Sequence, residues 1–237
     1  MTNNISSNVN PRENLTDLGG GYTLLQDQSA FRFGTDSVLL SKFARANSGD
    51  RVIDLGAGNG AVTVMLCQNH DALNVTAIEI QPEACDLVRR NIARNGLDET
   101  VNILEADLRK LEDVMPARCA DLIVCNPPYK PVGTGEPSAG QCALIARHEI
   151  MCTLQDAVQS AARLLKVGGR LCMVHKPERL AALMAEMKTF DIEPKRLALA
   201  AGNASIPPSI VLVEGRFKGR PGLIIEPLID LSRGYTQ

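Results

Sequence analysis

Short apolar runs alternate with longer amphipathic stretches along the middle of the chain. The apolar runs have the length and the endings of β-strands, and the longer stretches have the apolar spacing of α-helices. We predict strands at 51–56, 74–80, 101–107, 121–126 and 169–176, and helices at 59–70, 82–96, 153–169 and 177–190. Strands that alternate with helices of this length indicate a parallel sheet with helices on both faces.

The pattern changes after residue 195, where helices no longer separate the apolar runs. Residues 196–202 and 209–217 are two β-type runs joined by a short proline-containing link. They predict an antiparallel hairpin at one edge of the sheet. Before the first strand, residues 35–47 predict an amphipathic helix with Thr35 or Asp36 at its N-cap.

The start of the chain is polar and lacks such periodicity. Residues 1–20 predict a flexible N-terminal segment. No linker divides the remainder, so residues 21–237 are predicted to form a single domain.

The composition is that of an ordinary soluble protein, but its charge is uneven. Hydrophobic residues make up 45% of the chain and charged residues 22%, with a net charge of −2. Residues 1–150 carry 13 basic against 19 acidic residues, whereas residues 151–237 carry 12 against 8. A solvated surface explains this surplus on charge alone, and a weak basic face for an anionic partner is the alternative. The candidate residues for that face are Lys195, Arg196, Arg216, Lys218 and Arg220.

Cysteine usage and the terminal sequence indicate a cytoplasmic protein. The 7 cysteines show neither a C-x-x-C pair nor a zinc-ligand spacing, so we expect no metal and a reducing compartment. The polar N-terminus is no signal peptide, and no apolar run approaches the roughly 18 residues of a membrane span. The sequence carries no signal for an oligomeric state.

The stretch "DLGAGNGAV" (54–62) follows the first strand and opens a helix. Gly56, Gly58 and Ala61 fit the pattern G-x-G-x-x-G/A, and Glu79 ends the next strand about 20 residues later. A glycine-rich turn that only connects strand and helix is the alternative. The acidic residue at the end of the second strand favours a nucleotide site, where it would bind a ribose.

The carboxylate of Asp54, two residues before the first glycine, bears on the identity of the nucleotide. Its negative charge disfavours a pyrophosphate, and hence an NAD-dependent oxidoreductase. S-adenosylmethionine has an ammonium and a sulfonium but no phosphate. Glu79 would accept from the ribose hydroxyls, and Asp107, after the third strand, from the adenine amino group. The candidate cofactor residues at these strand ends are Asp54, Gly56, Gly58, Asn59, Glu79, Ile80, Asp107, Leu108 and Asn126.

The quartet Asn126-Pro127-Pro128-Tyr129 follows the fourth strand, where ligands of open α/β sheets bind. The Asn126 side-chain oxygen and the Pro127 carbonyl can accept both N–H bonds of a planar amine and free its lone pair. The prolines fix the carbonyl direction, and Tyr129 can stack on the acceptor. These four are the candidate catalytic residues, acting through position and electrostatics. A proline turn beside a core tyrosine is the alternative. The quartet does not choose between adenine and glutamine.

The acidic-glycine set and the NPPY quartet together resemble class I S-adenosylmethionine-dependent methyltransferases, over residues 35–217. This resemblance implies a Rossmann-like α/β fold whose seven-stranded, mostly parallel sheet has an antiparallel last strand. The stretches "FRFGTDSVLLSKFA" (31–44), "AIEIQPEACDLVRRNIARN" (77–95) and "VLVEGRFKGRPGL" (211–223) are similar to the bacterial valine-tRNA adenine-N6 methyltransferases. That family modifies adenine 37, beside the anticodon.

The resemblance implies S-adenosylmethionine as cofactor and tRNA as substrate. It places Thr35 and Asp36 near the methionine end of the cofactor. Arg147 and His148, which precede Glu149, would line the pocket and contact RNA, unless they form a surface turn. His175 is expected to be structural. The glycine- and proline-rich residues 131–142 predict a mobile loop.

Three further functions stay open at this point. A protein glutamine N5-methyltransferase shares NPPY but typically carries a separate N-terminal helical domain, for which about 50 residues are too few. An rRNA guanine-N2 methyltransferase is the second alternative. An RNA-binding protein that keeps the fold without catalysis is the third, although it need not retain both motifs.

Overall fold

In the computed structural model, residues 12–27, 34–127 and 152–233 are described. Four predicted site residues, Pro128, Tyr129, Arg147 and His148, lie outside these ranges, as does the predicted loop 131–142.

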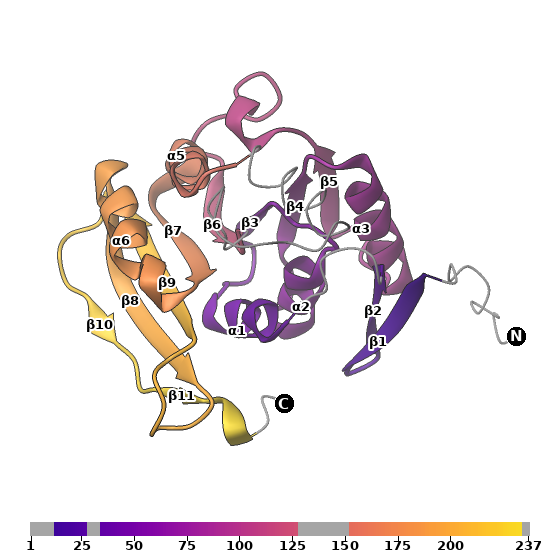
Figure 1. The fold of residues 1–237 in the computed structure, drawn as a ribbon. Helices are drawn as coiled ribbons and strands as arrows, with labels where there is room; N and C mark the ends of the chain where they lie inside the picture. The colour runs from indigo at the N-terminus through magenta and orange to yellow at the C-terminus, as the bar shows by residue number, and fades with distance from the viewer. Residues whose placement is uncertain (1–11, 28–33, 128–151, 234–237) are drawn as a thin grey trace, which may run out of the picture.

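A single large sheet runs through the molecule, and its strand order is β10-β8-β9-β7-β6-β3-β4-β5, with β11 also beside β8 (Figure 1). Its main strands are β3 (Arg51–Leu55), β4 (Asn74–Glu79), β5 (Val101–Glu105), β6 (Ala120–Cys125), β7 (Leu165–His175), β8 (Ile192–Ala201) and β9 (Ile210–Phe217). The described helices are α1 (Thr35–Phe43), α2 (Ala61–Asn69), α3 (Pro82–Arg94), α5 (Leu154–Leu164) and α6 (Leu180–Thr189). The predicted Rossmann-like α/β fold is confirmed.

The predicted hairpin at the end of the chain forms, but the sheet is larger than seven strands. Strand β9 lies antiparallel between β7 and β8, and the two-residue strands β10 (Ile224–Ile225) and β11 (Ile229–Asp230) extend the sheet to nine. The returning strand β9 therefore lies inside the sheet rather than at its edge. The chain after residue 217 covers the outer edge of β8, which would otherwise expose unpaired backbone groups.

The two faces of the sheet are buried under different helices because successive strand side chains point to opposite faces. Val52, Leu122 and Val124 pack on one face with α1, α2 and α3. Ile53 and Ile123, one residue away, pack on the other face with α5 and α6. This near-continuous apolar sequence is typical of a parallel sheet covered on both sides.

The helix predicted at 153–169 is shorter in the structure, where α5 spans Leu154–Leu164. It begins as expected, with Thr153 and Asp156 in a reciprocal capping box. It ends at Leu164, and β7 starts at the next residue. Gly169 is no helix stop: a Cβ there would lie 2.9 Å from the Lys166 carbonyl oxygen and 3.1 Å from that of Ala120. The glycine permits the close approach of β7 to β6.

The N-terminal segment contains a hairpin, so the prediction of flexibility up to residue 20 is wrong for its second half. Strands β1 (Glu13–Gly19) and β2 (Tyr22–Asp27) pair antiparallel, and three glycines of positive φ, Gly19, Gly20 and Gly21, form the turn. Polar composition misled the prediction because the hairpin is held by side chains of distant helices.

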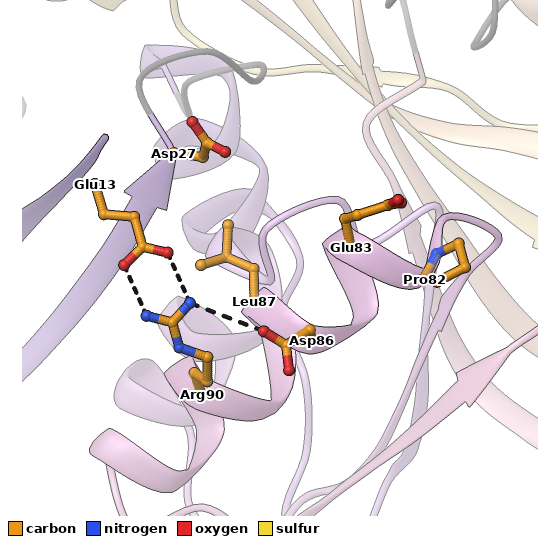
Figure 2. Close-up of a pocket in the computed structure, with 7 residues that line it drawn as sticks. All are labelled: Glu13, Asp27, Pro82, Glu83, Asp86, Leu87 and Arg90. Atoms are coloured by element: carbon orange, nitrogen blue, oxygen red, sulfur yellow. Dashed lines mark hydrogen bonds and ion pairs between the residues drawn. The ribbon is translucent and has the colours of Figure 1, made fainter. Parts of the chain in front are cut away.

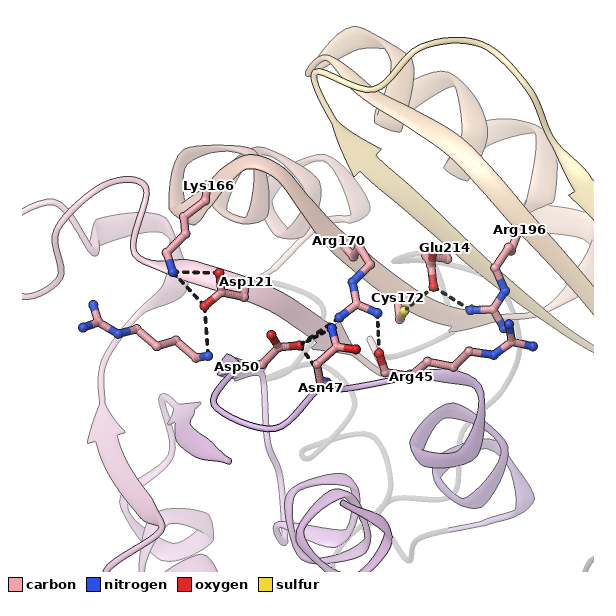
Figure 3. A network of polar contacts seen from close by, with 10 residues as sticks. Arg45, Asn47, Asp50, Asp121, Lys166, Arg170, Cys172, Arg196 and Glu214 are labelled. Carbon is pink, nitrogen blue, oxygen red and sulfur yellow. Dashed lines mark hydrogen bonds and ion pairs between the residues drawn. The ribbon is translucent and has the colours of Figure 1, made fainter. Parts of the chain in front are cut away.

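Arg196, a predicted RNA contact, makes ion pairs within the protein (Figure 3). Its guanidinium, with a side chain 11% exposed, pairs with Glu214 at 2.6 Å and with Glu226 at 2.8 Å. It also lies 4.2 Å from the centre of the Phe43 ring. This buried and fully engaged guanidinium fastens β8 to β9 and to the C-terminal extension.

Loss of this cation should leave Glu214 as an uncompensated buried charge. We expect Arg196→Met to lower the free energy of unfolding by about 3–5 kcal/mol, the cost of breaking a buried pair. Lys218→Ala is the matched control, because Lys218 pairs with Asp191 at 2.6 Å while both side chains are more than half exposed. It should cost less than about 1 kcal/mol. Urea unfolding measures both, and equal losses would contradict the assignment.

Candidate cofactor and substrate site

The loop from β3 to α2 owes its shape to three left-handed glycines. Gly56, Gly58 and Gly60 have φ values of 74°, 56° and 78°, which a side chain rarely tolerates. A Cβ at Gly56 or Gly58 would meet nothing within 4 Å, so open space lies beside both residues. The carbonyl of Ile78 accepts from Gly56 at 2.9 Å and from Ala57 at 3.0 Å, which ties the loop to β4. The loop can therefore receive a ligand at its backbone.

Glu79 holds the ends of β3 and β4 together. Its Oε1 accepts from the backbone N–H groups of Ile80 at 2.9 Å and Gln81 at 3.0 Å. Its Oε2 accepts from Gly58 at 2.9 Å. A carboxylate has about four acceptor positions. The structure therefore leaves room for about one ribose hydroxyl, whereas the sequence led us to expect two.

Asp54 is buried at the end of β3, where it is 1% exposed. Its Oδ2 accepts from the Thr63 hydroxyl of α2 at 2.7 Å. Burial raises the pKa of Asp54 to about 6, the Thr63 hydrogen bond opposes this rise, and the nearby Glu79 charge adds to it. The predictions did not include Thr63. A signal was present, because this hydroxyl falls within an otherwise apolar helix segment.

Asn126 lies directly beyond β6 and is held by the first helix. Its Nδ2 donates to the Ser37 hydroxyl oxygen at 3.2 Å, and Ser37 on α1 is only 4% exposed. The Asn126 side chain is thereby fixed at the carboxyl end of β6, beside α1. Pro127 is buried beside it. The sequence pointed to Thr35 and Asp36 on this helix, but the described contact comes from Ser37.

Asp107 is paired more fully than expected. It caps the short helix η1 (Leu108–Lys110) by accepting from the Arg109 N–H at 2.9 Å. The Arg109 guanidinium also donates to both carboxylate oxygens, at 2.6 to 3.1 Å. The hydrogen bonds from Arg109 hold the pKa of Asp107 below its ordinary value. An adenine amino group would compete with Arg109 for this carboxylate.

His175 ends β7 and is 3% exposed. Its Nδ1 accepts from the Lys176 N–H at 2.8 Å. Burial lowers the pKa of His175 to about 4, and the neighbouring Arg179 charge lowers it further while Asp36 opposes this. The imidazole is therefore neutral near pH 7. A buried, neutral and hydrogen-bonded ring fits the expected structural role.

The remaining basic candidates lie far along the sheet from Asn126. Arg216 in β9 pairs with Arg170 in β7, which pairs with Leu122 in β6. Leu122 precedes Asn126 by four residues, or roughly 13 Å along a strand. Lys218 and Arg220 follow Arg216 away from that edge, and Lys195 donates to the Arg220 carbonyl at 3.1 Å. Described cations at the same edge as Asn126 include Lys176 and Arg179.

The loop and its surroundings fit a nucleoside that carries no phosphate. Gly56 and Gly58 leave space for a ligand, and Glu79 retains one acceptor position. The charged residue that precedes the loop is Asp54, an acid, whereas a phosphate would be favoured by a basic residue. Asn59 lies between the glycines, and its Nδ2 is a buried donor without a hydrogen-bond partner. Ile80 and Leu108, also expected here, are half-buried at the ends of β4 and β5.

Within the described ranges, no group of three or more His, Cys, Asp or Glu side chains could hold a metal ion. None of the helices there is long and apolar enough to span a bilayer. The six described cysteines are free thiols.

Comparisons with known proteins identify the family of this chain and give further examples of its fold. The family model "Methyltransferase small domain" matches residues 28–191. A "tRNA1(Val) (adenine(37)-N6)-methyltransferase" of Parabacteroides distasonis is 29% identical, over 81% of this chain and 80% of that protein. The enzyme of the same name from Porphyromonas gingivalis is 31% identical, over 73% and 69%. Among solved structures, M. jannaschii TYW2 in complex with AdoMet shares the fold, with a TM-score of 0.59, 18% identity, and coverage of 87% and 86%.

The buried Asp54 carboxyl predicts a pH dependence of stability. Its folded pKa of about 6 exceeds its ordinary value of 3.8. Its stabilising contribution is therefore complete below pH 3.8 and is lost as the pH rises through 6. A rise of about two pKa units corresponds to about 3 kcal/mol of unfolding free energy from this group.

Asp54→Asn cannot ionise and should lack this loss. The difference in unfolding free energy between variant and wild type should shift in favour of the variant as the pH rises from 4.5 to 7.5. Urea unfolding at several pH values measures it, and parallel curves would show that Asp54 titrates normally. Thr63→Val removes the hydrogen bond that stabilises the anion, so it should move the transition to higher pH.

Proposed function

Because this chain belongs to the methyltransferase small-domain family, we propose that it transfers a methyl group from S-adenosylmethionine to N6 of adenine in tRNA. The proposed target is adenine 37 of a valine tRNA, which the names of its relatives state for those enzymes. The contact that carries the proposal is the hydrogen bond from Asn126 to Ser37. It fixes the Asn126 side chain at the edge of the sheet where the glycine loop lies, and we assign to its Oδ1 the role of acceptor for the substrate amine.

The cofactor supplies an electrophilic methyl group on a sulfonium. Gly56 and Gly58 would hold it against their backbone, and Glu79 would accept from a ribose hydroxyl. The carboxyl of Asp54 would favour a cationic ligand over a phosphate in the same loop. Thr35, Asp36 and Asp107 stay candidates for the methionine and adenine ends.

Asn126 and Pro127 are proposed to act by orienting the amine. Two acceptors, the Asn126 Oδ1 and the Pro127 carbonyl, would bind its two N–H groups and direct the nitrogen lone pair at the methyl group. Ser37 fixes the amide by accepting from its nitrogen. His175 is a weak base, since its pKa is about 4 and its Nδ1 already accepts from Lys176. The residues described here thus contribute position rather than proton transfer.

RNA contact and cytoplasmic location complete the proposal. The backbone of a tRNA requires Lys and Arg side chains near the site. Lys176 and Arg179 follow β7 at the edge that carries Asn126, so they supplement the predicted Lys195, Arg216, Lys218 and Arg220. Free cysteines throughout the described ranges fit a reducing cytoplasm.

Substitution of Asn126 tests the chemistry. Asn126→Ala should lower kcat by about 100-fold or more, the usual loss when an oriented polar group is removed from a transition state. Ser37→Ala should cost less, because the acceptor stays but loses its anchor. The assay follows transfer of labelled methyl from S-adenosylmethionine to unmodified tRNA, and nucleoside mapping should find N6-methyladenosine. Methylation of a protein glutamine without any RNA product would instead select the glutamine alternative.

Two charge reversals separate the possible RNA contacts. Arg179→Glu should raise the KM for tRNA about tenfold and reduce the slope of log affinity against log salt by about one unit or more. Arg216→Glu makes the same charge change at the other end of the sheet and serves as the comparison. A larger effect at Arg216 would favour the face predicted from the sequence. Binding of S-adenosylmethionine should be equal in both variants.

A further inference from the structure

The hairpin β1–β2 lies ahead of residues 28–191, the part that matches the family model. It stands beside α3, at the opposite end of the molecule from β8 and β10 (Figure 1). On one side β2 pairs with β1. Its other edge faces no strand in the described ranges. Side chains from α3 and its C-cap take the place of a neighbouring strand by bonding to the backbone of β2.

Two asparagines one helical turn apart, Asn91 on α3 and Asn95 at its C-cap, act as this substitute for a strand. Asn95 accepts from the Thr23 N–H at 2.8 Å and donates to the Thr23 carbonyl at 2.8 Å. Asn91 accepts from the Leu25 N–H at 2.6 Å and donates to the Leu25 carbonyl at 3.0 Å. Alternate strand residues and helix positions i and i+4 each share one face. The two amides therefore pair with β2 as a neighbouring strand would.

Only one of the two amides also reaches the glycine loop. The Nδ2 of Asn91 donates to the Asn59 carbonyl oxygen at 2.9 Å, and Asn91 is 0% exposed. The other side of the same peptide is held as well, since the Gly60 N–H donates to the Ala57 carbonyl at 2.8 Å. The Asn95 amide instead makes its additional bond to the Asn91 carbonyl, at 2.7 Å.

Other contacts dock the hairpin without touching that loop. Arg90 and Glu13 form two bonds of 2.7 Å, at the rim of a pocket of about 470 Å³ lined by the hairpin and α3 (Figure 2). Gln68 of α2 donates to the carbonyls of Leu18 and Gly19. These ties hold the hairpin in place, so a local change at Asn91 need not release it.

We propose that the hairpin β1–β2 is a working part of the cofactor site, coupled to it through Asn91. Asn91 is a positioning residue: it fixes the Asn59 peptide so that Gly56 and Gly58 keep the backbone shape that receives the nucleoside. Binding of S-adenosylmethionine in the glycine loop then stabilises the docked hairpin, and the docked hairpin in turn strengthens this binding. This inference rests on the proposed function only in taking S-adenosylmethionine as the ligand of the loop.

Asn91→Asp and Asn95→Asp form a matched pair, since each keeps the acceptor oxygen for β2 and loses the amide donors. Only Asn91→Asp removes the bond to Asn59. By calorimetry, its Kd for S-adenosylhomocysteine should rise about tenfold or more, the scale expected when a binding group shifts slightly. Asn95→Asp should stay within about threefold of wild type. In the methyl-transfer assay, Asn91→Asp should raise the KM for S-adenosylmethionine far more than it lowers kcat.

Hydrogen exchange tests the coupling first in the wild-type protein and then in the variant. Because coupling is reciprocal, S-adenosylhomocysteine should slow exchange of the Leu25 amide, and this slowing should be lost in Asn91→Asp. Unchanged exchange at Leu25, or equal Kd values for the two aspartate variants, would overturn the inference. If the wild type binds no S-adenosylhomocysteine, the proposed function fails, and the coupling fails with it.

Discussion

The site depends on the Glu79 carboxylate, which accepts hydrogen bonds from three backbone N–H groups. It joins the end of β4 to the glycine loop after β3 through Gly58, and to its own following residues through Ile80 and Gln81. Left-handed glycines give the loop its shape, but they are also the residues that lose most conformational entropy on folding. The buried Glu79 carboxylate, which accepts from the Gly58 N–H, helps to offset that loss, and open space remains beside Gly56 and Gly58.

Buried charge is handled in two different ways in this molecule. Arg196 is paired with Glu214 and Glu226, and these ion pairs hold β8, β9 and the C-terminal extension together. In the described part of the chain, Asp54 has no cation beside it to match its charge, so burial raises its pKa; the Glu79 charge adds to this rise, and hydrogen bonds from Thr63 oppose it. The first arrangement is suited to structure. The second leaves the Asp54 carboxyl without a described counter-ion near the glycine loop. A cationic ligand bound there would lower the pKa of Asp54 again.

Amide side chains make the long connections around the site. Asn126 reaches α1 through Ser37, and Asn91 reaches both β2 and the glycine loop. An amide both donates and accepts, so one side chain can satisfy two backbone groups or link two segments. In this way the N-terminal hairpin, which precedes the matched family region, is linked to the glycine loop, and α1 is linked to the residue after β6.

Local pattern was sufficient for the seven main strands of the sheet, apart from the starts of β7 and β8, for the glycine loop and for the end of β6 before Asn126-Pro127. Each depends on neighbouring residues: apolar periodicity, positive φ at glycine, and the missing N–H of proline. The capping box at Thr153 belongs to the same class. The hairpin β1–β2 was missed because its stability comes from Asn91, Asn95 and Arg90, more than 60 residues away, and not from its own polar sequence.

Tertiary structure alone decided which polar residues are engaged and at which edge they lie. The sequence does not distinguish Arg196 from Arg216. In the structure Arg196 is paired with two carboxylates, whereas Arg216 is exposed near the end of the sheet away from Asn126. Glu79 and Asp107 are both acidic residues at or just beyond the ends of strands. The Asp107 carboxylate binds Arg109, whereas the Glu79 carboxylate accepts from the glycine loop. Strand register and packing across the sheet set these partners, and neither is encoded in the spacing of residues along the chain.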